Sequence, residues 1–152
     1  MVARAEDGRR VVAHFQDGRV LKGTTQDFAP HKSRFHLFLD GDESSRPLDV
    51  PVGALKALFF VKTWAGDSKR VDDNSFARAT GQGRRLVVTF ADGEVLAGFT
   101  MGYASDKPGF FLIPADPNAN NARVFVVKGA TKKVEFVIAS NPVFAAAAGR
   151  RA

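Results

Sequence analysis

The 152-residue chain contains no cysteine, which excludes disulfide bonds, thiolate zinc sites and a cysteine nucleophile. Tryptophan and tyrosine occur once each, although there are 14 phenylalanines. The opening residues MVARAEDGRR show no hydrophobic signal region, and no apolar stretch is long enough to span a membrane. We therefore expect a cytoplasmic protein that has no membrane partner.

Patterns that mark an enzyme are missing as well. No nucleophile–base pair, Walker loop or dinucleotide fingerprint is present, and GQGRR at 81–85 leads into a predicted strand rather than a helix. His14, His31 and His36 do not have the spacing of a metal site. We expect a non-enzymatic protein with no catalytic residue, no metal and no cofactor.

The chain contains one stretch of sequence twice. Residues 8–23 read GRRVVAHFQDGRVLKG and residues 83–98 read GRRLVVTFADGEVLAG, so that 10 of 16 positions are identical. Self-similarity of this kind indicates duplication of one structural unit. We predict a first unit at 8–62, a linker at 63–82, a second unit at 83–140 and a tail at 141–152.

Each unit has the pattern of five short strands. The expected strands are 9–15, 20–28, 35–39, 48–52 and 57–62, and then 84–90, 95–103, 110–114, 123–128 and 133–138. Asp-Gly at 17–18 and 92–93 favours hairpin turns, and Gly23 and Gly98 indicate a bend in the second strand of each unit. Regular short strands separated by turns are typical of an all-β barrel or sandwich, and the linker could hold a short helix at 72–79.

The order of these signals resembles the Sm/LSm family of small, SH3-like β-barrels. The resemblance rests on VVAHFQDGRVLKG and LVVTFADGEVLAG for the first motif of that family, and on VFVVKGATKKVEFV for the second. It implies two tandem five-stranded Sm-like barrels, which in that family assemble into rings by pairing of edge strands. Ser33 and Pro108 stand where that family has a base-reading Asn. Phrases such as LKALFFVK and GFFL also resemble an uncharacterised bacterial tandem-repeat family.

Three groups of basic residues are candidates for nucleic-acid binding. The net charge of +6 favours an anionic partner. The guanidinium groups of arginines match the geometry of phosphate oxygens. A basic loop beside aromatic residues suits single-stranded nucleic acid. In Sm-like rings the turn of the second motif faces the pore. The groups are Arg9, Arg10, Arg84 and Arg85 at the strand starts; His31, Lys32 and Arg34 in a loop; and Lys128, Lys132 and Lys133 at that turn. For each group the alternative is an ordinary solvated surface.

Several apolar residues are expected on outward faces of the strands. Such residues are more often covered than exposed, so we expect them to form a contact between the two units or between chains. They are Phe38, Phe59, Phe111, Ile113 and Tyr103.

Two functions follow from these patterns. The first is a binding module that assembles into a homo-oligomeric ring and binds RNA or another polyanion. The alternative is a protein–protein interaction or regulatory module with no nucleic-acid role. Salt separates the two, because binding through phosphate contacts weakens steeply as salt rises.

Overall fold

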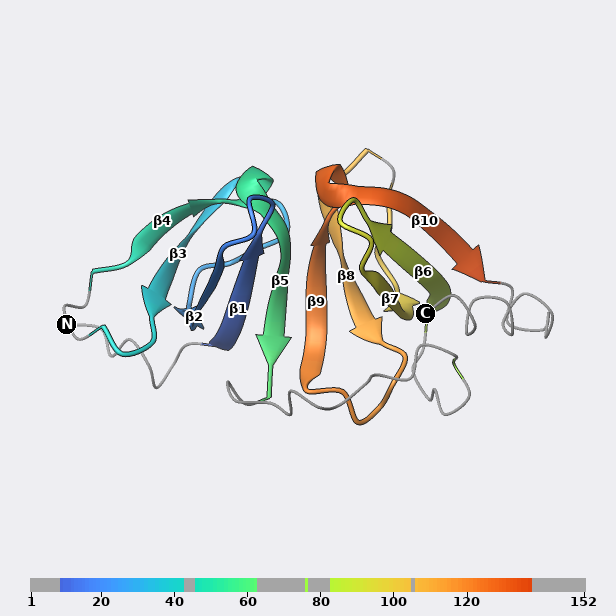
Figure 1. Ribbon diagram of the computed structural model, residues 1–152, viewed down its shortest axis with the longest axis horizontal. Coiled ribbons are helices and arrows are strands. Elements are labelled where there is room, and N and C mark those ends of the chain that lie inside the picture. Colours follow the sequence, from blue (N-terminus) through green and yellow to red (C-terminus); the bar gives the residue numbers. More distant parts are fainter. Residues whose placement is uncertain (1–8, 43–45, 63–75, 77–82, 105, 138–152) are drawn as a thin grey trace.

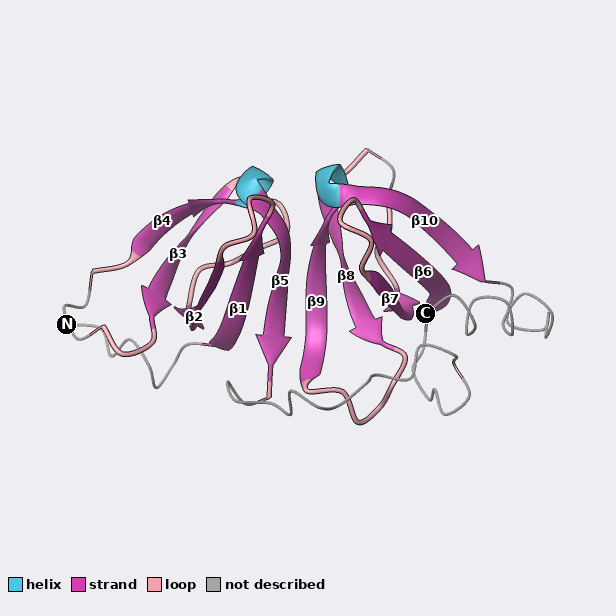
Figure 2. Cartoon of the chain, in the orientation of Figure 1, coloured by secondary structure: helices cyan, strands magenta, loops and turns pink. Residues whose placement is uncertain are grey.

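The computed structural model describes residues 9–42, 46–62, 76, 83–104 and 106–137. Within these ranges the protein is all-β, with ten strands, two short 3-10 helices and no α-helix (Figures 1 and 2). The predicted tail at 141–152 lies outside the described residues. So does the predicted linker at 63–82 with its helix at 72–79, apart from Phe76.

The same order of elements occurs twice. The first half contains β1 (Arg9–Phe15), β2 (Val20–Thr25), β3 (Arg34–Leu39), β4 (Leu48–Pro51), η1 (Val52–Ala54) and β5 (Leu55–Val61). The second half contains β6 (Arg84–Phe90), β7 (Val95–Thr100), β8 (Gly109–Pro114), β9 (Asn121–Val127), η2 (Lys128–Ala130) and β10 (Thr131–Val137). β1 and β6 begin and end at the predicted residues. In each half a 3-10 helix lies directly before the last strand.

All ten strands belong to one antiparallel sheet. Their order is β10-β6-β7-β8-β9-β5-β1-β2-β3-β4, so that β10 and β4 are its two free edges. The prediction of two closed five-stranded barrels is therefore corrected: the sheet is open, and β5 pairs with β9 of the other half. Figure 1 shows this pair at the centre, with one curved wing on either side. We call the β5–β9 pair the seam.

The seam forms because its strands are apolar on both faces. Leu58 and Phe60 of β5 belong to the core of the first half, which also contains Phe125 of β9. Ala57 and Phe59 of β5 face the other way and belong to the core of the second half. A closed five-stranded barrel would leave one of these faces in water, and pairing with β9 buries both.

Gly23 and Gly98 allow the third strand of each half to approach the second closely. Gly23 pairs with Leu39 and Gly98 pairs with Pro114, and each pairing extends over only two residues. A Cβ on Gly23 would overlap the carbonyl oxygen of Phe38, and a Cβ on Gly98 would overlap that of Ile113. These glycines therefore hold the curvature that the sequence predicts at both positions.

Positions that are apolar in the seam carry charge at the free edges. Counted from the 3-10 helix of each half, Glu135 of β10 has the place of Phe59. Asp49 of β4 has the place of Phe125 in the same way. Glu135 also forms an ion pair with Lys133 at 3.5 Å. Charged side chains on an edge strand disfavour pairing with another chain.

The close approach at Gly23 and Gly98 can be tested by substitution. Because a methyl group has no space at either position, we expect Gly23→Ala and Gly98→Ala each to lower the free energy of unfolding by about 2 kcal/mol or more. Urea denaturation measures the change. Gly53→Ala is the control, since a Cβ there meets nothing within 4 Å. Equal effects at Gly53 and Gly23 would contradict the packing described.

Candidate nucleic-acid interface

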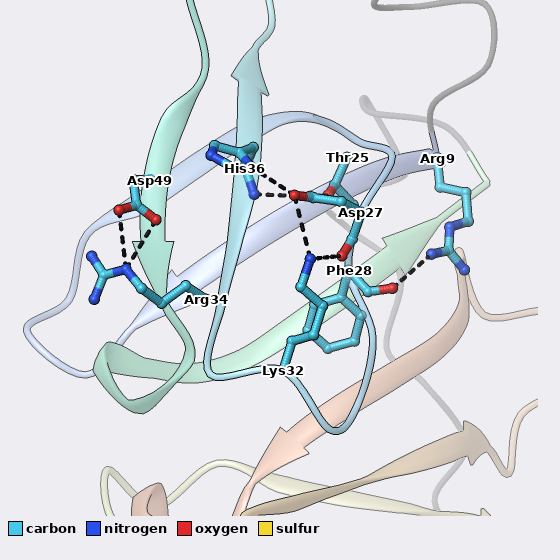
Figure 3. Close-up of polar contacts among 8 residues, drawn as sticks. All are labelled: Arg9, Thr25, Asp27, Phe28, Lys32, Arg34, His36 and Asp49. Carbon is cyan, nitrogen blue, oxygen red and sulfur yellow. Dashed lines mark hydrogen bonds and ion pairs between the residues drawn. The ribbon is translucent and has the colours of Figure 1, made fainter.

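The basic loop of the first half is organised by Asp27, which follows β2. The carboxylate of Asp27 accepts a hydrogen bond from the backbone N–H of His36 at 2.9 Å and contacts Nδ1 of His36 at 2.6 Å (Figure 3). The Nζ of Lys32 lies 3.7 Å from the same carboxylate and donates to the carbonyl of Asp27 at 3.1 Å. The charge of Lys32 is therefore largely committed to the fold of its own loop.

The other predicted residues of this loop are also placed. The Nε of Arg34 contacts both carboxylate oxygens of Asp49 at 3.0 Å, which neutralises the guanidinium (Figure 3). His31 is exposed and lines a small pocket between the two halves, together with Lys32, Ser33, Val52, Gly53, Pro108 and Val127. The loop as a whole offers less free positive charge than its sequence indicates.

The lysines of the second-motif turn have three different settings. Lys128 donates from Nζ to the carbonyl of Ala104 at 2.8 Å and lies 5.1 Å from the ring centroid of Tyr103. Lys133 pairs with Glu135. Lys132 is exposed at the start of β10. These three residues do not converge on one site.

The paired arginines at the strand starts pack against aromatic rings or bond to backbone. Arg9 lies 5.1 Å from the ring centroid of Phe60, and Arg10 donates to the carbonyl of Lys62 at 2.9 Å. In the second half both arginines lie on rings. Arg84 lies 3.8 Å from the ring centroid of Phe136. Arg85 lies 5.3 Å from the ring centroid of Phe76 and 5.8 Å from that of Phe99.

An aromatic cluster fills the first half beside the seam. Phe28 is its centre, and the ring centroids of Phe35, Phe60, Phe111 and Phe125 lie between 5.0 and 6.1 Å from that of Phe28. Phe111 and Phe125 come from β8 and β9 of the second half, so this cluster draws on both halves. It is closed to solvent apart from the partly exposed Phe111.

The second half has a matching set of rings, of which Phe110 is buried and the other two are partly exposed. Tyr103 lies 5.0 Å from Phe110 and 5.1 Å from Phe136, between ring centroids, as Phe28 lies beside Phe35 and Phe60. Tyr103 and Phe136 remain partly exposed because no strand of the described chain pairs with the outer edge of β10. We call the group Arg84, Tyr103, Lys128 and Phe136 the open aromatic surface.

The predicted interface residues fall into three groups. Phe59 packs in the core of the second half, and Phe111 lies against the cluster of the first half, so both sit between the halves. Phe38 is half-buried on β3, and Ile113 of β8 is exposed. Tyr103 belongs to the open aromatic surface.

Three residues whose polar or ring contacts organise the structure were not selected from the sequence. Asp27 follows a strand with no motif around it, and the position of Arg123 is Pro47 in the first repeat. Lys56 reaches across to the turn of the second half and forms ion pairs with Asp92 at 2.7 Å and with Glu94. Burial alone would lower the pKa of Lys56, but its hydrogen bonds to both carboxylates raise it.

Comparison with known proteins identifies a family. A model of a family of unknown function, DUF6982, matches residues 7–138. The chain belongs to the DUF6982 family. This agrees with the expected likeness to an uncharacterised domain family and does not extend to Sm or LSm proteins. No curated protein and no solved structure matches this DUF6982 chain.

The described residues of the DUF6982 chain contain no group of three His, Asp or Glu that could hold a metal ion. Among the same residues, no helix has the length and apolar character needed to cross a membrane.

The role of Asp27 can be tested through pH. Burial would raise the pKa of Asp27, but its bonds to His36 and the charge of Lys32 outweigh burial and lower it. A lowered pKa stabilises the fold above the unfolded-state value near pH 4, and this stability is lost as pH falls through the folded value. We expect Asp27→Asn to cost about 1 kcal/mol at pH 7, with a smaller difference below about pH 4.

Urea denaturation between pH 3 and pH 7 measures this difference. Asp49→Asn is the matched control, because Asp49 forms an exposed ion pair with Arg34 and should contribute little. A cost for Asp27→Asn that stays the same at pH 3 would contradict the assignment.

Proposed function

We propose that this DUF6982 protein is a non-enzymatic binding module for RNA or another polyanion, and that it binds through the open aromatic surface. The observation that carries the proposal is the contrast between the halves. The rings beside the seam are covered by Phe111 and Phe125, whereas Tyr103 and Phe136 stay accessible with cations packed on them.

Accessible rings beside cations suit single-stranded nucleic acid. Bases stack on aromatic side chains irrespective of sequence, and each stack contributes about 1–3 kcal/mol. Arg84 forms no ion pair with a carboxylate of the described residues, so its guanidinium is available to a phosphate. Lys128 adds a second positive charge beside Tyr103. Single-stranded RNA is therefore the polyanion that this surface fits best.

We infer that the two halves arose by duplication of an Sm-like unit. The repeated sequence, the repeated order of elements and the matched pairings Arg9↔Thr25 and Arg84↔Thr100 support this. Assembly of several chains into a ring through β10 and β4 stays a prediction. The charges of Asp49 and Glu135 weigh against it, since they would have to be buried at positions that the seam fills with Phe125 and Phe59.

The proposal predicts the behaviour of two variants. Arg84→Met keeps the apolar contact with Phe136 but removes the charge, and Tyr103→Leu removes a stacking ring. We expect each to weaken binding of a fluorescent oligo-uridine about tenfold at 100 mM salt, because each removes about 1–2 kcal/mol of phosphate or stacking contact. Fluorescence anisotropy measures the dissociation constant.

Arg19→Met is the control, because Arg19 also stacks on a ring, that of Phe15, but pairs with Asp17. Wild-type affinity should fall steeply with salt, and light scattering on the same samples separates a single chain from a ring. Absence of oligo-uridine binding by the wild type would refute the proposal and favour the protein–protein module. Equal loss in all three variants would also refute it.

A further inference from the structure

Two arginines from different halves pack on one phenylalanine ring. Arg9 at the start of β1 lies 5.1 Å from the ring centroid of Phe60, and Arg123 near the start of β9 lies 4.7 Å from the same centroid. Arg123 also lies 4.2 Å from the ring centroid of Phe111. The two like charges are thus brought together by the pairing of Phe60 with Arg123 in the seam.

Neither arginine has a counterion among the described residues. No carboxylate in the part of the chain that the structure describes forms an ion pair with Arg9 or Arg123. Within the described ranges, the hydrogen bond found for the guanidinium of Arg9 is the one that it donates to the backbone carbonyl of Phe28, at 3.3 Å (Figure 3). Burial lowers the pKa of Arg123, and the charge of Arg9 lowers it further. Two like charges held near each other without a counterion destabilise the fold unless an anion lies beside them.

The other stacked arginine of the first half has a different setting. Arg19 lies 4.5 Å from the ring centroid of Phe15, and its Nε contacts Asp17 at 2.9 Å. A stacked arginine can therefore still pair with a carboxylate, so stacking alone does not explain why Arg9 and Arg123 form no ion pair with a carboxylate of the described residues. In the second half Arg84 stacks on Phe136 without a second arginine, so the pair occurs once among the described residues.

We propose that Arg9 and Arg123 form an oxyanion site at the seam that binds a phosphate group. Two guanidinium groups held by rings are pre-oriented, and each can donate two parallel hydrogen bonds to phosphate oxygens. The site needs both halves, because Arg9 belongs to β1 and Arg123 to β9. It goes beyond the proposed function, since neither arginine belongs to the open aromatic surface.

Inorganic phosphate is the probe that tests this site. Calorimetric titration at pH 7.5 compares the full chain with Arg9→Met, Arg123→Met and Arg19→Met, in sodium chloride of equal ionic strength. We expect saturable binding of one phosphate per wild-type chain. The two seam variants should bind about tenfold more weakly, and Arg19→Met should bind like the wild type.

Thermal unfolding provides a second measurement. Phosphate should raise the melting temperature of the wild type and of Arg19→Met above that in chloride, and it should leave Arg9→Met and Arg123→Met unchanged. A wild type that responds equally to phosphate and chloride would overturn the proposal. Equal weakening by Arg19→Met would also overturn it, because general surface charge would then explain binding. The proposed oligo-uridine binding through Arg84 and Tyr103 is tested by different variants and is judged separately.

Discussion

The pairing of β5 with β9 is the interaction on which the rest of the structure depends. Through this pairing Phe125 of the second half enters the core of the first half, where its ring lies 5.0 Å from that of Phe28. Phe59 of the first half enters the core of the second half in return. Neither half has a complete core without the other, as expected for units of this size. The ion pairs of Lys56 with Asp92 and Glu94 add a polar link between the same halves.

The seam also makes the two similar halves unequal. In the first half, β9 supplies the neighbour that covers Phe28 and Phe60. In the second half, the corresponding edge of β10 has no neighbour among the described residues, and Tyr103 and Phe136 remain accessible. One fold element used twice therefore produces a covered surface and an open one. The proposed binding of RNA rests on this difference.

Much of the fold could be predicted from local patterns. The Asp-Gly turns, Gly23 and Gly98 act through their own backbone, and the strands β1 and β6 lie where alternation places them. Whether each half closes into a barrel or joins a common sheet could not be predicted. Alternation does not show which strand covers an outward residue such as Phe59. The partner, β9, is more than 60 residues away.

The candidate site was predicted less well for the same reason. Lys32 and Arg34 look free in the sequence, but the folded chain places Asp27 and Asp49 beside them. Counted from the 3-10 helix of each half, Pro47 has the place of Arg123, so the repeat comparison could not select Arg123. Arg84 and Tyr103 were both selected, but for different roles, and only the fold places both of them beside Phe136.

Amide hydrogen exchange on Phe125→Ala tests most directly whether the seam makes the two halves one folding unit. Removal of a fully buried ring costs about 3–5 kcal/mol, and loss of that size should lower exchange protection throughout the core that contains the ring. The account predicts loss of protection in β1, β3 and β5 of the first half as well as in β9. Loss confined to the second half, with β1 and β3 protected as in the wild type, would contradict it.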